Sequence, residues 1–86
     1  MYEVSFTETA IRQLKKLEKN TMKRIMRSIE RIQIRPYDFV RKLSGSPYFR
    51  LRVGDYRVIM DIQKQELRIL IVYVGHRRKV YKNIYS

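Results

Sequence analysis

The 86-residue sequence carries 20 lysines and arginines against 8 acidic residues, a formal net charge of +12 at pH 7. This length allows one domain with a modest hydrophobic core, and we expect residues 1–86 to form it. There is no cysteine and only one histidine. Disulfides, thiolate zinc sites, cysteine nucleophiles and polyhistidine metal sites are therefore excluded, and we expect neither a metal nor a cofactor.

The basic excess points to a polyanionic partner. A charge of this size repels itself unless nucleic acid, a ribosome or an acidic protein neutralises it. The first residues, Met1–Val4, lack the pattern of a signal peptide. The longest apolar run, Ile69–Val74, is too short to cross a bilayer. We expect a soluble, cytoplasmic domain that does not associate with membranes.

The first half of the chain predicts a strand and two helices. Alternating apolar residues favour a strand over Tyr2–Phe6, and Thr7 is a suitable N-cap for a helix over about Glu8–Glu18. Asn20 and Thr21 can end this helix and cap a second one. That helix is expected from about Met22 to Arg35, where Pro36 stops it, so the two helices form an antiparallel hairpin.

The second half predicts mostly strands. Residues 37–48 contain both prolines and suggest an irregular connection. Strands are then expected over Phe49–Val53 and Tyr56–Ile62, joined by a type II′ turn at Gly54-Asp55. Leu67–Val74 reads as a central strand covered on both faces and ended by Gly75, and Lys79–Tyr85 as a weak last strand. The fold class is α+β: a helical hairpin packed on a twisted, mainly antiparallel sheet.

The two-residue turn also fixes which side chains are neighbours. It places Val53 opposite Tyr56, Arg52 opposite Arg57, Leu51 opposite Val58 and Arg50 opposite Ile59. One face then carries the apolar residues and becomes the core face, whereas Arg50, Arg52 and Arg57 share the other face. Opposed like charges cost up to about 1 kcal/mol, so either the trio binds an anion or it merely reflects the basic composition of the chain. We favour an anion such as phosphate.

A second candidate group follows the predicted central strand. The segment Gly75-His76-Arg77-Arg78-Lys79-Val80-Tyr81 supplies one imidazole, three cations and a phenol. His76 is the default general acid or base, although a lone histidine is more often structural. Tyr81 could stack on a base or transfer a proton, or could simply pack.

Basic residues also line both predicted helices. They recur at helical spacing in the second helix and decorate the first: Lys23, Arg27, Arg31 and Arg35, then Arg12, Lys15, Lys16 and Lys19. Such stripes usually form a solvated face, and here they could attract a large RNA surface.

Several segments together resemble the RelE/ParE toxin superfamily. They are Arg41-Lys42-Leu43-Ser44-Gly45, the hairpin from Phe49 to Ile59, Val74-Gly75-His76-Arg77 and Val80-Tyr81. The opening YEVSFTETAIRQLKKLEK fits as well, so the resemblance covers essentially the whole chain. It implies a RelE-like toxin of a type II toxin–antitoxin system.

The RelE branch of this superfamily is a set of mRNA interferases, and the resemblance therefore implies a metal-independent endoribonuclease. The ribose 2′-hydroxyl of mRNA in the ribosomal A site would attack the adjacent phosphate, which stops translation. By the same resemblance, Arg50 and Arg52 surround the scissile phosphate and Arg57 stabilises its developing charge. Arg77 contacts the phosphate or protonates the leaving group, and Tyr81 stacks on or activates the mRNA.

This chain departs from the RelE pattern at two strand positions. Arg50 and Arg52 stand where the best-known pattern has lysines, and an arginine cannot give up its proton in a protein. The general base would then be Tyr81 or His76, or substrate positioning by the ribosome would do much of the work. Tyr85 could compete for the tyrosine role, and RNA-binding contacts are also expected from Arg78, Lys79 and Tyr85.

Two alternative functions remain open from the sequence, and one further partner is implied. The ParE branch shares the fold but targets DNA gyrase, and a catalytically weak module could bind RNA or the ribosome without cleavage. Retention of the basic residues and of Tyr81 favours the RNase branch. The resemblance also implies a cognate, RelB-like antitoxin that masks the basic face in a toxin–antitoxin hetero-oligomer.

Overall fold

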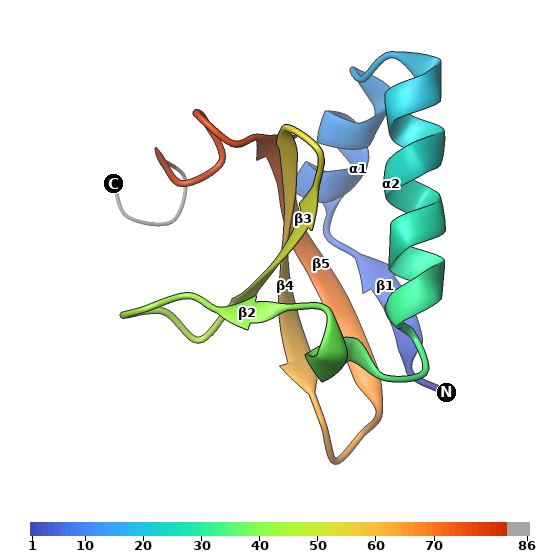
Figure 1. Cartoon of the computed structure of the whole chain (residues 1–86), viewed down its shortest axis with the longest axis vertical. Helices are drawn as coiled ribbons and strands as arrows, with labels where there is room; N and C mark the ends of the chain where they lie inside the picture. Colours follow the sequence, from blue (N-terminus) through green and yellow to red (C-terminus); the bar gives the residue numbers. More distant parts are fainter. Residues whose placement is uncertain (83–86) are drawn as a thin grey trace.

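A five-stranded sheet with both helices on one of its faces forms the fold (Figure 1). The structure is a computed structural model in which residues 1–82 are described. The elements in chain order are β1 (Glu3–Phe6), α1 (Glu8–Lys15), α2 (Lys19–Ile32), the 3-10 turn η1 (Pro36–Asp38), β2 (Arg41–Lys42), β3 (Phe49–Val53), β4 (Tyr56–Gln63) and β5 (Arg68–His76). The expected α+β class is confirmed. Within residues 1–82, no helix is long and apolar enough to cross a membrane.

The strands lie in the order β1-β5-β4-β3-β2. β1 runs parallel to β5, and all other neighbours are antiparallel. The register with β5 shifts between Ile59 and Met60 of β4. Val72 of β5 therefore has no partner residue on β4 and forms a bulge. Two side chains of the α1 region form hydrogen bonds with the backbone of β5 there. The Thr7 hydroxyl donates to the Val72 carbonyl at 2.8 Å, and the Val74 N–H donates to Gln13 Oε1 at 2.7 Å.

Both helices form where the periodicity predicts them, but with different ends. Thr7 is confirmed as the N-cap of α1, since its hydroxyl accepts from the Ala10 N–H at 3.1 Å. Asn20 and Thr21 do not cap α2, which already begins at Lys19 and holds them in its first turn. Polar residues cost little there because the first backbone N–H groups of a helix have no partner within it.

The C-terminal end of α2 is set by a contact with the start of the chain. The helix ends at Ile32 rather than near Arg35. The Tyr2 N–H donates to the Gln33 carbonyl at 2.8 Å, and Gln33 Nε2 donates back to the Tyr2 carbonyl at 3.0 Å. These bonds satisfy backbone groups that would otherwise continue the helix.

The sheet differs from the expectation at three places. Residues expected to be irregular include the short strand β2, which pairs with Phe49 and Arg50 of β3. β5 continues through Gly75 to His76. The last strand expected over Lys79–Tyr85 is wrong within the described residues, because 77–81 form turns in which the Lys79 and Val80 N–H groups donate to the His76 carbonyl. Residues 83–85 of that expectation lie outside the described part.

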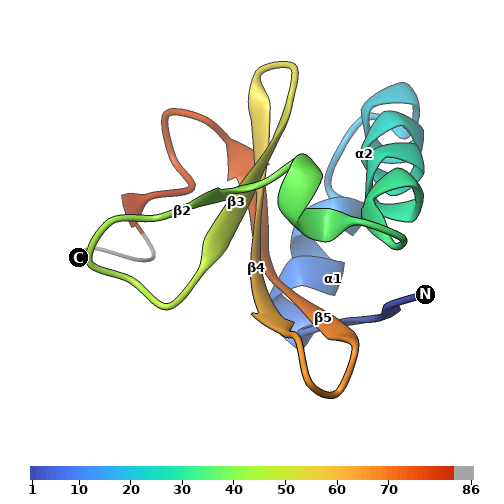
Figure 2. The same ribbon diagram turned by 60° about the horizontal axis from the view of Figure 1, so that its bottom comes forward.

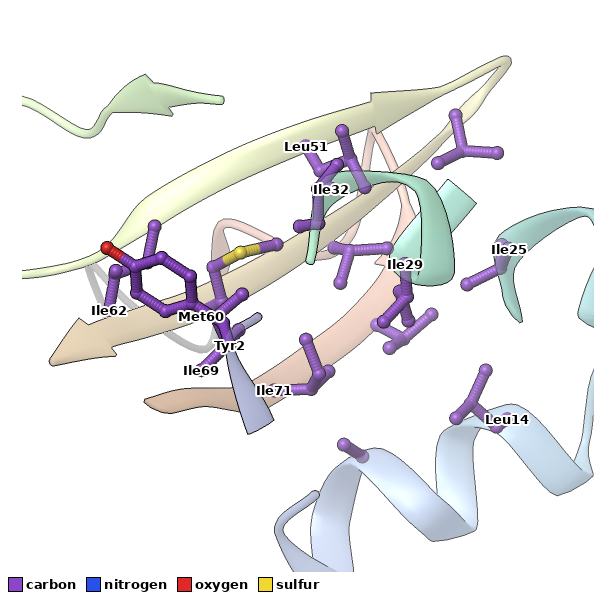
Figure 3. Packing of buried hydrophobic residues seen from close by; sticks show 14 residues of the cluster. Tyr2, Leu14, Ile25, Ile29, Ile32, Leu51, Met60, Ile62, Ile69 and Ile71 are labelled. Carbon is purple, nitrogen blue, oxygen red and sulfur yellow. The ribbon is translucent and has the colours of Figure 1, made fainter. Parts of the chain in front are cut away.

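The main core lies between the sheet and the helices (Figure 3). Ile25, Ile29 and Ile32 of α2 are buried against it, because their spacing puts all three on one side of the helix. The predicted core face of the β3–β4 hairpin is confirmed, since its apolar residues belong to this cluster: Phe49, Leu51, Val53, Tyr56, Val58 and Met60.

Candidate active site

The face of the sheet that points away from the helices carries the candidate site. Figures 1 and 2 show the helices on one side of the sheet, with the β2–β3 loop and the turns after β5 on the other. The predicted hairpin register is confirmed: Arg52 pairs with Arg57 and Arg50 with Ile59. The φ angle of Gly54 is +58°, and Asp55 has no positive φ, as the type II′ turn requires. We call this the outer face.

Arg57 lies on the outer face, but it is not a free cation. Its exposure is only 8%, and Nη1 donates to the carbonyls of Gly54 and Tyr56, each at 2.9 Å. Its partner on β5 is Gly75, which leaves room because it has no side chain. Of the three arginines predicted on this face, Arg57 is therefore the buried one. The same contacts hold its guanidinium in a fixed position, as a preorganised charge requires.

The arginines of β3 differ in their surroundings. Arg50 is half-buried, and Arg52 is exposed. Arg50 has a second arginine opposite it, since β2 pairs Arg41 with Arg50. The sequence analysis missed Arg41 as a site residue because β2 was not expected. The available signal was the apolar Leu43 two residues later, since strand periodicity puts Arg41 and Leu43 on the same face.

The turns after β5 bring Arg77 to the tip of the hairpin. The Arg77 N–H donates to the Asp55 carbonyl at 2.8 Å, and Arg77 Nε lies 4.0 Å from Asp55 Oδ1. Both side chains are largely exposed, so this ion pair is weak and a phosphate can compete with it. Asp55 is a neighbour that the sequence analysis did not foresee. Arg78 and Lys79 are exposed on the same turns.

A small apolar cluster fixes these turns to the outer face. Val80, Leu43 and Ile59 are buried in it, with three tyrosines packed around them: Tyr48, Tyr73 and Tyr81. Tyr81 is therefore held at this face by its ring and is only partly buried. Tyr85 lies outside the described residues.

His76 belongs to the opposite face. It pairs with Tyr56 of the core face, and the two rings meet edge to face with centroids 5.6 Å apart. The Arg78 N–H donates to His76 Nδ1 at 3.2 Å. The structure thus separates His76 from Arg50 and Arg57, although the sequence places it next to Arg77.

The outer face therefore combines cations with the phenols of Tyr48, Tyr73 and Tyr81. Arg41 and Arg50 lie toward one end, and Arg57 and Arg77 lie near the hairpin turn, close to the segment that carries Tyr81. Such a surface can bind phosphates and stabilise negative charge that develops on them. In the part of the chain that the structure describes, no group of three His, Asp or Glu residues could hold a metal ion.

Comparison with known proteins gives a family and a set of similar structures. Residues 4–81 match the family model described as the ParE toxin of the type II toxin–antitoxin system parDE. No curated protein sequence matches the chain. The toxin–antitoxin complex RelBE2 from Mycobacterium tuberculosis contains a chain 26% identical to this one, with a TM-score of 0.79, covering 88% of this chain and 98% of that one.

Two further structures show the same fold. A chain of the archaeal RelE–RelB complex from Pyrococcus horikoshii is 27% identical, with a TM-score of 0.77, covering 92% of this chain and 98% of the other. The isolated E. coli RelE toxin is 20% identical, with a TM-score of 0.76, covering 98% and 95%. The two helices and five-stranded mixed sheet described above are thus the fold of RelE toxins.

Proposed function

This chain belongs to the family of ParE toxins of type II toxin–antitoxin systems, within the RelE/ParE superfamily, and we propose that it acts as a ribosome-dependent endoribonuclease. Its substrate would be mRNA in the ribosomal A site, and cleavage would inhibit translation. The observation that carries the proposal is the outer face, which carries the buried guanidinium of Arg57 and further cations, and against whose apolar cluster Tyr81 packs.

The proposed reaction is a transesterification within the RNA. The 2′-oxygen forms a bond to the adjacent phosphorus while the bond from phosphorus to the 5′-oxygen breaks, which leaves a 2′,3′-cyclic phosphate. One proton leaves the 2′-hydroxyl and one is taken up by the 5′-oxygen. Arg57 and Arg50 would stabilise the charge that develops on the phosphate, and Arg77 would contact the phosphate near the leaving group.

Tyr81 is the proposed proton-transfer residue on this face. Arginines cannot act as bases, and His76 lies on the helix side of the sheet against Tyr56. We therefore assign proton transfer to Tyr81 and a structural role to His76. Because 86 residues offer little room to enclose a substrate, the ribosome would supply the other wall of the site and orient the mRNA.

The proposed protein partner is a RelB-like antitoxin. The similar chains from M. tuberculosis and P. horikoshii were solved in complexes of toxin and antitoxin. An acidic or amphipathic antitoxin segment would be complementary to a toxin of net charge +12 and would mask the outer face.

Primer extension on mRNA that is being translated tests the proposal. Purified protein added to programmed ribosomes should produce cuts at A-site positions, and the same mRNA without ribosomes should stay intact. Growth arrest on expression with no A-site cut in the mRNA would contradict the proposal.

Inhibition of DNA gyrase is the second candidate function. It is favoured by the matching family model, which is described as ParE toxin, and by the similar structure described as a YoeB/ParE toxin from Agrobacterium tumefaciens. A supercoiling assay distinguishes the two functions: the endoribonuclease proposal predicts no inhibition by concentrations of protein that fully cleave A-site mRNA.

A further inference from the structure

A cleft of about 360 Å³ separates α2 from the turn between β3 and β4. Four arginines line it: Arg24, Arg27 and Arg31 from α2, and Arg52 from β3. Arg52 was expected on one face with Arg50 and Arg57, and the structure places it along this cleft. None of the described lining residues is acidic.

The turn holds the first of these arginines in place. A Cβ atom built on Gly54 would lie 2.9 Å from Arg24 Nη1 and 3.2 Å from Arg24 Cζ. The guanidinium therefore packs directly against the backbone of Gly54. Glycine suits this position because its φ of +58° disfavours any side chain, and a Cβ there would also push the tip of the Arg24 side chain aside.

The other arginines form a row along the helix. Arg24, Arg27 and Arg31 follow each other at spacings of three and four residues, so their side chains are neighbours on one side of α2. Within residues 1–82 the only ion pair joins Arg77 to Asp55. The four guanidiniums of the cleft thus have no carboxylate partner there, and their mutual repulsion is relieved only by solvent or by an external anion.

We propose that this cleft binds the phosphodiester backbone of RNA, at a site separate from the catalytic outer face. A row of guanidiniums at regular spacing suits a ligand whose anionic groups also recur regularly, and arginine pairs with phosphate in bidentate geometry. An acidic peptide carries its carboxylates on flexible side chains and matches such a row less well. The Ser28 hydroxyl donates to the Arg24 carbonyl at 3.1 Å, so recognition of the anion falls to the arginines.

This inference rests on the proposed function, because it supplies a second contact that holds the toxin on ribosomal RNA while the outer face acts on mRNA. Phosphate contacts by such residues position a protein and make binding depend on salt, without reading sequence. Removing the arginines that α2 contributes should weaken RNA binding and leave the reaction itself intact.

The test compares two double variants with the same charge. Arg27→Gln/Arg31→Gln changes the cleft, and Lys23→Gln/Arg35→Gln removes two exposed charges outside it, so each variant falls from +12 to +10. Affinity for a fluorescent RNA hairpin is measured between about 50 and 200 mM salt. For the cleft variant, the slope of log K against log salt should become less negative by about 1.4 to 1.8, for two lost phosphate contacts. The control should change by less than half of that.

Equal slopes and affinities for the two variants would overturn the inference, as would a wild-type protein that does not bind the hairpin. Cleft-dependent binding of polyglutamate without cleft-dependent binding of RNA would overturn it in favour of an acidic protein segment. The proposed function is tested separately, by measuring A-site cleavage with the wild-type protein. If cleavage fails while cleft-dependent RNA binding persists, the proposed function is wrong and the cleft assignment stands.

Discussion

The guanidinium of Arg57 is held by two backbone carbonyls at 2.9 Å and is almost completely buried. In contrast, Arg77 Nε lies 4.0 Å from Asp55 Oδ1, and the Arg77 side chain is half exposed. The family resemblance implies that both residues act on the phosphate. Because their surroundings differ, a substitution would have different effects at the two positions. Loss of Arg57 also removes two hydrogen bonds to backbone carbonyls, whereas loss of the Arg77 side chain removes one exposed ion pair.

Arg77→Ala should therefore separate activity from stability. We expect A-site cleavage to fall by a factor of about 10² to 10³, the usual effect of removing one electrostatic donor to the transition state. The free energy of unfolding should change by less than about 0.5 kcal/mol, because the ion pair is exposed. Arg57→Ala should lower cleavage similarly and also cost about 1 to 3 kcal/mol of stability. Cleavage at the wild-type rate by Arg77→Ala would contradict its assignment.

Tyr81→Phe tests the proton-transfer role with little change in packing. The ring of Tyr81 packs against the cluster around Val80, and phenylalanine keeps that ring. We expect cleavage to fall by a factor of about 10² to 10⁴, the range of general acid–base catalysis, in a kinetic assay on programmed ribosomes.

Tyr73→Phe is the matched control, because Tyr73 packs against the same cluster but comes from β5 itself. It should cleave at the wild-type rate. If both variants lose activity equally, the hydroxyl of Tyr81 has no special role. If His76→Gln is the variant that loses activity instead, the general base lies on the helix side of the sheet.

At the scale of elements, the hairpin turn links the outer face to the arginine cleft. Gly54 sits between them: its carbonyl accepts from Arg57, and its backbone supports Arg24. One turn thus positions a guanidinium on each side of the hairpin. The strand register that creates this arrangement follows from the two-residue turn and was predictable from the sequence.

Gly54→Ala should lose stability through backbone strain. A non-glycine residue at a positive φ loses about 1 to 2 kcal/mol, whereas the new Cβ would meet only the flexible tip of the Arg24 side chain, which can move aside. Gly45→Ala should lose stability for the same reason, because Gly45 has a φ of +73° with nothing within 4 Å of an added Cβ. Urea unfolding measures both losses. A wild-type free energy of unfolding for Gly54→Ala would contradict the need for glycine at this turn.

Elements whose limits depend on distant contacts were the ones that the sequence analysis missed. α2 ends early because Gln33 bonds to Tyr2, and β2 exists because Arg41 and Lys42 meet β3. The turns after β5 do not form a strand, because Val80 docks on the outer face instead. Periodicity within a segment reports the face that it buries, but not the partner that fixes its ends.

For the candidate site, as for the fold, the sequence predicted the features that depend on strand register and missed those that depend on tertiary contacts. Register alone paired Arg52 with Arg57 and Arg50 with Ile59, and that pairing is confirmed. The lining of the cleft beside α2 by Arg52 was not predicted. The burial of Arg57, the pairing of Arg77 with Asp55 and the position of His76 on the other face depend on tertiary contacts. Local sequence patterns carry no signal for them.

At the scale of the whole molecule, the charge of +12 separates into distinct surfaces. The outer face carries Arg41, Arg50, Arg57 and Arg77, and the cleft beside α2 carries four more guanidiniums, including that of Arg52. The sheet and its hairpin turn lie between these two surfaces. Under the two proposals made above, the toxin would hold RNA at one surface while it acts on RNA at the other.

The chemistry of the cleaved ends tests the central claim most directly. Programmed ribosomes are incubated with the purified protein, and the 3′ ends of the mRNA fragments are analysed by mass spectrometry. Attack by the 2′-hydroxyl predicts A-site fragments that end in a 2′,3′-cyclic phosphate. Fragments that end in a free 3′-hydroxyl, or mRNA that stays intact on ribosomes arrested by the toxin, would contradict the account.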